Sequence, residues 1–130
     1  MGAALPDRAK ELLDGKSFAV VSTIQPDGSP QSSVVWVKRD GDEVLFSTVQ
    51  GRRKHLNLVR DPRITLVLNP PDHPYTYAEL RGEVEMTTEG GRELIDELSR
   101  KYRGEDYGFD GPEDVRVVVR LAPRKVVGNL

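Results

Sequence analysis

Short turn-forming connections between β-rich segments constrain the fold of this 130-residue chain more than any other feature. A β-branched, apolar segment at residues 17–25 ends at Pro26-Asp27-Gly28-Ser29, and the next, at 30–38, ends before Asp40-Gly41. Proline, aspartate and glycine in these orders form tight turns, and Asp-Gly between apolar runs is typical of a hairpin. Such connections leave no room for helical crossovers, so they predict a mainly antiparallel sheet.

The remaining periodic segments predict a mainly β chain with helices at its margins. Further strands are expected at residues 43–49, 63–68, 75–87 and 116–121, with a last extended segment at 123–130. Helices are expected at residues 6–14, 51–60 and 88–102. Several strands are apolar on both faces, and a sheet of six or seven such strands curls or closes into a small barrel.

The helical patterns also predict which side chains face the core. Leu94, Ile95 and Leu98 share one face of the third helix, and in the second helix we expect Leu56 and Val59 to face the core. The acidic loop at residues 105–114 is expected to be a solvated surface.

Length and composition narrow the functions open to the chain. Residues 1–130 fit a single domain. There is no cysteine, which excludes a disulfide framework and a thiolate nucleophile. No segment has the apolar length of a signal peptide or membrane span, so we expect a cytoplasmic protein with no membrane partner. A net charge of −2 and only eight aromatic residues argue against a nucleic-acid partner.

Hydrolytic and metal chemistry find little support in the sequence. The histidines are His55, beside a basic triplet, and His73, between prolines, and neither belongs to a metal-binding or nucleophile motif. We therefore predict no metal site and no catalytic side chain. A cofactor enzyme needs neither, because the cofactor carries the chemistry while the protein supplies binding and orientation.

The stretch at residues 46–63 is the most informative one for function. It passes through Ser47, Thr48 and Gly51 into a helical pattern that opens with Arg52-Arg53-Lys54, and it carries a charge of +4. Hydroxyls, free N–H groups at a helix start and adjacent cations are the groups that hold a phosphate. A solvated basic helix face is the alternative interpretation.

Motifs in a fixed order extend this interpretation over most of the chain. They are Ala19-Val-Val-Ser-Thr-Ile24, Asp27-Gly-Ser-Pro30, Ser33-Val-Val-Trp-Val37, Leu45-Phe-Ser-Thr48, Gly51-Arg-Arg-Lys54, Asn57-Leu58, Arg60-Asp-Pro-Arg63 and Glu79-Leu-Arg-Gly-Glu83. Their order and spacing resemble the split-barrel flavin and deazaflavin (F420) oxidoreductases related to pyridoxamine 5′-phosphate oxidase.

The resemblance implies a six-stranded antiparallel split β-barrel, of the FMN-binding split-barrel type, and a homodimer with its cofactor groove between the subunits. It implies a phosphate held by Ser47, Thr48, Arg53 and Lys54, with Arg52 beside them for an acidic cofactor tail. The cofactor ring would lie against residues 31–37, and the residues that would contact it are Gln31, Ser33, Val35 and Trp36.

Three aromatic residues have two interpretations each. Trp36 is either a packing residue or a contact of the ring. Tyr75 and Tyr77 either line the groove of the second subunit or pack in the interface.

Among relatives, the sequence is most similar to the short branch that uses F420. The function that this implies is an F420-dependent oxidoreductase that transfers a hydride between the reduced cofactor and a small conjugated or heteroaromatic acceptor. Two alternatives keep the fold: an FMN-binding oxidase or flavin reductase, and a non-catalytic protein that stores or carries the cofactor. A small β-barrel that binds single-stranded nucleic acid is the least favoured alternative.

Overall fold

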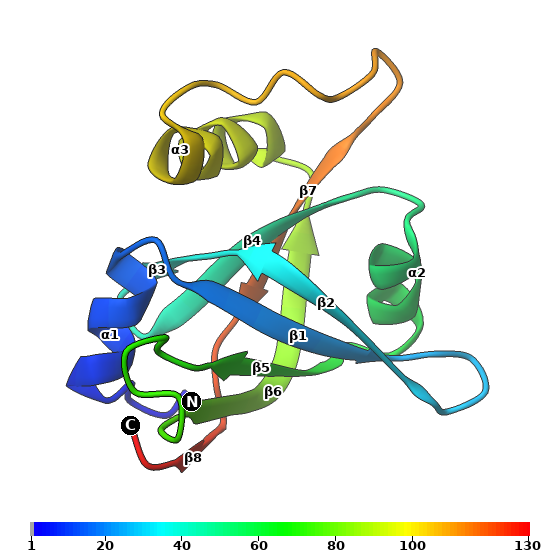
Figure 1. The fold of residues 1–130 in the computed structure, drawn as a ribbon. Helices are drawn as coiled ribbons and strands as arrows, with labels where there is room; N and C mark the ends of the chain where they lie inside the picture. Colours follow the sequence, from blue (N-terminus) through cyan, green and yellow to red (C-terminus); the bar gives the residue numbers. More distant parts are fainter. Residues whose placement is uncertain (1) are drawn as a thin grey trace.

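A computed structural model describes residues 2–130, which form eight strands and three helices (Figure 1). The helices are α1 (Asp7–Asp14), α2 (Arg53–Arg60) and α3 (Gly91–Arg103). The strands are β1 (Phe18–Ile24), β2 (Pro30–Trp36), β3 (Lys38–Asp40), β4 (Glu43–Val49), β5 (Arg63–Leu68), β6 (Ala78–Thr87), β7 (Arg116–Leu121) and β8 (Lys125–Gly128). None of the three helices is long and apolar enough to cross a membrane.

The strands form one curled antiparallel sheet in the order β2-β1-β5-β6-β7-β4-β3, with β8 paired to β6. The long strand β6 joins the two halves: Glu83 is paired with Arg63 of β5, and Val84 is paired with Leu121 of β7. This change of partner turns the sheet through a corner and confirms the predicted split barrel. The number of strands exceeds the predicted six because β3 and β8 are short additional strands.

A glycine lies beside this corner. A Cβ at Gly82 would lie only 3.0 Å from the Ala122 carbonyl oxygen and 3.0 Å from a Leu121 methyl carbon. The absence of a side chain therefore lets the segment after β7 approach β6 closely.

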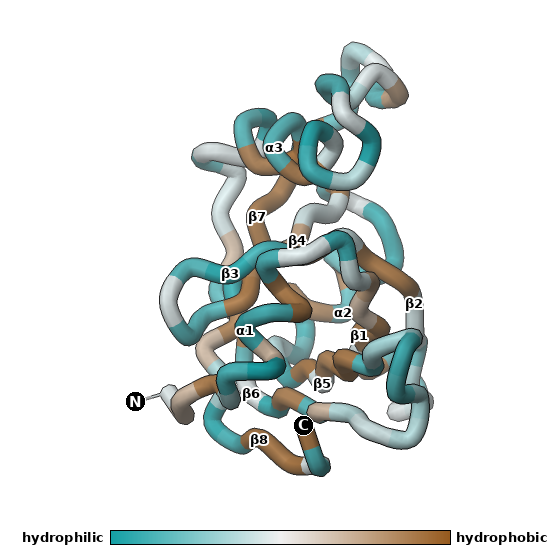
Figure 2. The backbone as a smooth tube through the Cα atoms, turned by 60° about the vertical axis from the view of Figure 1, so that its left-hand side comes forward, coloured by the Kyte–Doolittle hydropathy of each residue, from teal (hydrophilic) through white to brown (hydrophobic). Residues whose placement is uncertain are grey.

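The core fills the inside of the curl, and apolar residues are concentrated on the strands (Figure 2). Phe46, Leu66 and Leu80 are among its fully buried side chains. Helix α1 covers one end with Ala9, Leu12 and Leu13, which are all buried, as its spacing predicts.

Helix α3 packs outside the barrel against β4 and β7 (Figure 1). Leu94, Ile95 and Leu98 are buried there, as predicted. Because α3 covers this side, β7 is buried on both faces: Arg116 and Val118 are buried together with Val117 and Val119.

The predicted orientation of α2 is wrong. Leu56 is 45% exposed and Val59 is 63% exposed, while Asn57 and Leu58 are buried. In a helix of only eight residues, either of two apolar faces can pack against the core. Here the face with Leu58 packs into the core while the Asn57 amide donates a hydrogen bond to the Thr23 hydroxyl of β1.

The strand predicted from Tyr75 begins only at Ala78. The Thr76 N–H donates to the His73 carbonyl in a turn, and the Tyr77 carbonyl accepts hydrogen bonds from the N–H groups of Asn129 and Leu130. Tyr75 and Tyr77 are therefore exposed in a loop beside the C-terminus rather than on one face of a strand.

Candidate functional site

A groove of about 390 Å³ lies between β2, β4, the start of α2, and α3 with the loop that follows it. This volume falls within the range of small-molecule sites. Nine of the eleven side chains predicted to bind the cofactor line it: Gln31, Ser33, Val35, Trp36, Ser47, Thr48, Arg52, Arg53 and Lys54. Tyr75 and Tyr77 do not line this groove, so their predicted contribution to a partner subunit's groove stays a prediction.

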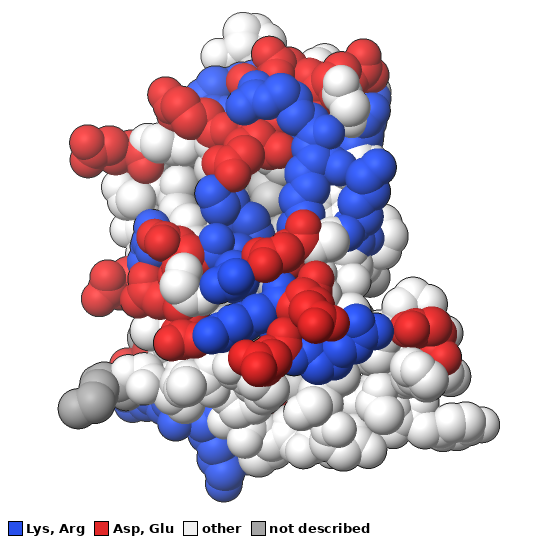
Figure 3. All heavy atoms as spheres, turned by 90° about the vertical axis from the view of Figure 1, so that its left-hand side faces the viewer, with Lys and Arg blue, Asp and Glu red and all other residues white. Residues whose placement is uncertain are grey.

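Three consecutive cations form one wall of the groove. Arg52, Arg53 and Lys54 all line it, and within residues 2–130 none of them forms an ion pair with a carboxylate. Many other surface cations are paired with carboxylates, as Lys38 is with Glu97 and Arg39 with Asp14, and on the face in Figure 3 Lys and Arg are interspersed with Asp and Glu. Unpaired adjacent cations repel one another, so this wall favours an anionic ligand.

Lys54 is the most enclosed of the three cations. Its ammonium lies 5.7 Å from the centre of the Phe46 ring, and its side chain is partly buried. Burial lowers the pKa of Lys54 below its usual value, and the neighbouring Arg52 charge lowers it further. A bound anion would raise this pKa again, because an opposite charge nearby favours the charged form of the ammonium.

The start of α2 offers further donors to the groove. Its N-cap, Arg52, makes no capping hydrogen bond with its side chain, so the N–H groups of the first turn lack a side-chain acceptor. The preceding turn is held by Gly51, whose φ is 91° and whose N–H donates to Nδ1 of His55 at 3.0 Å. His55 thus braces the turn.

Hydroxyl groups line the groove next to the cations. Ser47 and Thr48 come from β4, and Ser33 comes from β2. The Ser33 hydroxyl oxygen is buried and has no hydrogen-bond partner in the described chain. Buried polar atoms are rarely left without a partner, so this orphaned hydroxyl fits a polar ligand in the groove.

An aromatic wall completes the groove. The Trp36 ring stacks on Tyr102 of α3 with centroids 5.4 Å apart, and the Tyr107 ring meets the Trp36 ring edge-on at 6.1 Å. Trp36 and Tyr107 both line the groove, so Trp36 is both a packing residue and part of the site. Flat aromatic side chains in the same groove as hydroxyls and cations suit a planar ring that carries a phosphate.

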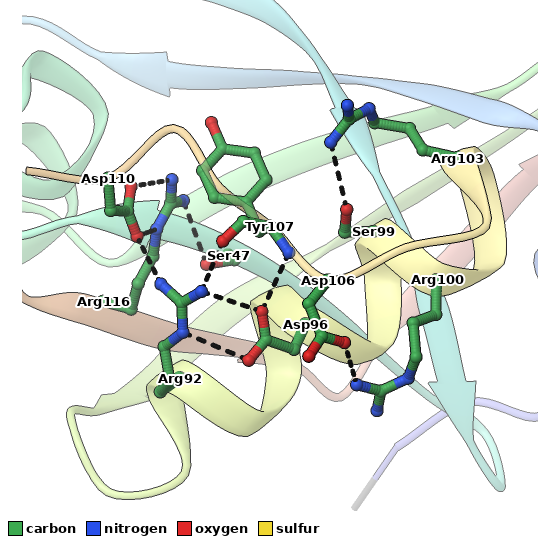
Figure 4. A network of polar contacts seen from close by, with 10 residues as sticks. All are labelled: Ser47, Arg92, Asp96, Ser99, Arg100, Arg103, Asp106, Tyr107, Asp110 and Arg116. Atoms are coloured by element: carbon green, nitrogen blue, oxygen red, sulfur yellow. Dashed lines mark hydrogen bonds and ion pairs between the residues drawn. The ribbon is translucent and has the colours of Figure 1, made fainter.

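The acidic loop is not simply a solvated surface, and the prediction is wrong for two of its residues. Tyr107 lines the groove, and the Asp110 side chain is only 7% exposed. Figure 4 shows Asp110 facing the guanidinium groups of Arg116 and Arg92. Asp96 of α3 accepts a hydrogen bond from the Tyr107 N–H at 2.9 Å.

Arg116 is the groove residue that the sequence pattern missed. It lines the groove from β7, where its guanidinium donates to the Ser47 hydroxyl at 3.3 Å and lies 4.7 Å from the centre of the Tyr107 ring. In the sequence it is one charged residue of an alternating strand. No local signal distinguishes it from Arg120, which pairs with Glu43 and Asp40 at the surface.

No group of three or more histidine, aspartate or glutamate side chains in residues 2–130 is arranged to hold a metal ion. The groove itself is lined by cations, hydroxyls and apolar side chains. These groups suit an anionic organic ligand.

Comparison with known proteins agrees with the sequence and the fold. The sequence pattern of the pyridoxamine 5′-phosphate oxidase family matches residues 5–128. The chain belongs to this family.

Solved structures of similar proteins share the fold. A protein described as an F420 reductase is 27% identical, with a TM-score of 0.82 over 95% of this chain and 98% of that one. A conserved hypothetical protein from Mycobacterium tuberculosis is 23% identical, with a TM-score of 0.77 over 98% and 85% of the two chains. A candidate pyridoxamine 5′-phosphate oxidase from Listeria innocua is 18% identical, with a TM-score of 0.73 over 94% and 95%.

Proposed function

We propose that this family member is an oxidoreductase that binds the deazaflavin coenzyme F420 in the groove. It would transfer a hydride between this cofactor and a small conjugated or heteroaromatic acceptor. The observation that carries the proposal is the convergence, in one groove, of three unpaired cations, an orphaned hydroxyl and a flat aromatic wall. The similarity to an F420 reductase supports the choice of cofactor.

Different residues of the groove would bind different parts of the cofactor. Arg53 and Lys54, with the Ser47 and Thr48 hydroxyls and the first turn of α2, would hold the phosphate. Arg52 would pair with the acidic tail that F420 carries and FMN lacks. Three cations exceed what one phosphate needs, and this surplus favours F420 over FMN.

The ring end of the groove would position the reactive heterocycle. Ser33 would donate its free hydroxyl proton to a polar atom of the ring, and Trp36 would lie against the ring. When bound, F420 supplies the hydride chemistry, and the protein supplies orientation and electrostatics. This division explains how a site without a general base or nucleophile can belong to an enzyme.

A parallel titration tests the choice of cofactor. Purified protein would be titrated with F420 and with FMN, each followed by fluorescence, at two salt concentrations. We expect tighter binding of F420 than of FMN, and weaker binding at the higher salt because exposed charges are screened. Equal or tighter binding of FMN would favour the FMN-dependent alternative. Tight F420 binding without turnover of any acceptor would favour cofactor storage.

We further propose that the groove is completed in a homodimer. Phe18, Val20 and Val34 lie on the outer face of β1 and β2 and are 57%, 42% and 64% exposed. Val20 and Val34 are cross-strand partners, and Val34 also lines the groove, so this apolar face is continuous with the site. Contiguous exposed apolar surface usually marks an interface, and a second copy related by twofold symmetry is the simplest occupant.

Light scattering at micromolar concentration tests the dimer. We expect the mass of two chains for the natural protein and a shift toward one chain for the Val34→Glu variant. The mass of a single chain for the natural protein would exclude the shared groove.

A further inference from the structure

A chain of hydrogen bonds runs from the C-terminal end of α2 to the groove. The Arg60 guanidinium donates to Oδ1 of Asn57 at 3.4 Å, and Nδ2 of Asn57 donates to the Thr23 hydroxyl at 3.0 Å. The Thr23 hydroxyl in turn donates to Oε1 of Gln31 at 3.0 Å. Asn57 is fully buried, Thr23 is 1% exposed, and Gln31 lines the groove.

The orientation of the Asn57 amide is fixed by the chemistry of the first member of this chain. A guanidinium group has donors only, so Arg60 requires the Asn57 oxygen to face it. The Asn57 NH₂ group must then face Thr23. The Thr23 hydroxyl accepts from Asn57 with one lone pair, and its single proton is donated to the Oε1 atom that Gln31 turns toward it.

The last member of the chain presents its donor to the ligand. Because Oε1 of Gln31 is held by Thr23, the NH₂ group is the part of the amide left for other partners. One contact of this group, to the Ser32 carbonyl, is long at 3.4 Å. The second N–H has no partner within residues 2–130.

We infer that Thr23 and Asn57 are positioning residues that fix the Gln31 amide, so that the groove offers an N–H donor to a ring carbonyl or ring nitrogen of its ligand. This inference rests on the proposed function for the identity of the ligand. It assigns to Gln31 a defined polarity: the site selects a heterocycle with a hydrogen-bond acceptor at this edge.

A purely structural role is the competing explanation, because the same contacts hold α2 against β1. The two explanations predict different results when the direction of the hydrogen bonds is reversed. A structural link survives reversal of the hydrogen bonds, whereas ligand recognition does not. The Asn57→Asp substitution performs this reversal: the new carboxylate only accepts, so the Thr23 proton turns toward it. The Gln31 amide must then donate to the Thr23 oxygen and present its own oxygen to the groove.

Binding of F420, followed by fluorescence, is the first readout. We expect Asn57→Asp and Gln31→Glu each to weaken binding by about tenfold, since each places an acceptor opposite an acceptor. Thr23→Val, which removes the link, should weaken binding, and the matched Thr23→Ser variant should restore it. Unchanged affinity in Asn57→Asp and Thr23→Val, with only the melting temperature altered, would overturn the inference and favour the structural role.

Nuclear magnetic resonance of the side-chain amides gives a readout that needs no ligand. The Gln31 NH₂ signals, assigned by their loss in Gln31→Glu, should exchange rapidly with water in the natural protein and more slowly in Asn57→Asp. Signals already protected in the natural protein, and unchanged by Asn57→Asp, would contradict the inference even if F420 binds. Conversely, failure of F420 to bind the natural protein would contradict the proposed function while this measurement still decides the amide orientation.

Discussion

The Arg116 guanidinium donates two hydrogen bonds to the Asp110 carboxylate, at 2.7 and 2.8 Å, and both side chains are only 7% exposed. This pair joins the loop after α3 to β7 at the edge of the groove (Figure 4). It also holds Arg116 where its guanidinium reaches the Ser47 hydroxyl. The acidic loop therefore contributes to the groove through Tyr107 and through the Asp110–Arg116 pair.

Removing the carboxylate from this pair should destabilise the protein. Asp110→Asn leaves the buried Arg116 charge facing a neutral amide, with Arg92 close by. We expect a loss of about 3 kcal/mol in the free energy of unfolding, measured by urea denaturation. Glu113→Gln, at an exposed position of the same loop, should change it by less than about 0.5 kcal/mol. Similar changes in the free energy of unfolding for the two variants would mean that the Asp110–Arg116 pair contributes little to stability.

The same pair should make stability depend on acidity. Hydrogen bonds from Arg116 hold the pKa of Asp110 below its usual value in the folded protein. Because the pKa of Asp110 is lower in the folded protein, the unfolded chain binds the proton at a higher pH than the folded protein does as the pH falls. The contribution of Asp110 is therefore complete above about pH 4 and is lost as the pH falls through the folded pKa. The stability difference between the natural protein and Asp110→Asn should shrink below about pH 4, and a constant difference would contradict this origin.

Arg53→Ala and Lys54→Ala should weaken F420 binding by tenfold to a hundredfold, as expected from about 1.5–3 kcal/mol per charged hydrogen bond. The melting temperature of the cofactor-free protein should hardly change, because neither side chain has an ion-pair partner in the described chain. Arg52→Ala should be milder for FMN than for F420, since only F420 carries the acidic tail. Unchanged affinity in the first two variants would identify the wall as a solvated basic surface.

The partly buried side chain of Lys54 predicts the pH dependence of binding. Its pKa lies below that of an ordinary lysine, so the side chain loses its charge at a lower pH. F420 affinity should therefore decline at a lower pH than the pH of about 10.4 at which an ordinary lysine titrates. Lys54→Arg keeps a permanent charge and should flatten this decline. A decline that is identical in both proteins would assign it to another group.

Because α3 packs closely on β7, we expect a substitution of Gly91 to destabilise the protein. A Cβ at Gly91 would collide with the backbone carbonyl of Arg116, whereas a Cβ at Gly108 meets nothing within 4 Å. Gly91→Ala should therefore lower the free energy of unfolding by about 1–3 kcal/mol. It should also disturb the groove through Arg116. Gly108→Ala, in the loop, is the control and should be close to neutral in calorimetry.

The sequence by itself determined the order of the elements, the antiparallel pairing and the basic start of α2, because these depend on turn residues and local periodicity. It also placed Ser47, Thr48 and the three cations at one site, since they are neighbours in the chain. Only the tertiary structure brought in Arg116 and Tyr107, which follow α3 and meet the groove through contacts distant in sequence. The same holds for Asn57, whose role depends on which face of a short helix turns inward. Contacts of this kind are decided by packing between elements, and local sequence patterns do not encode them.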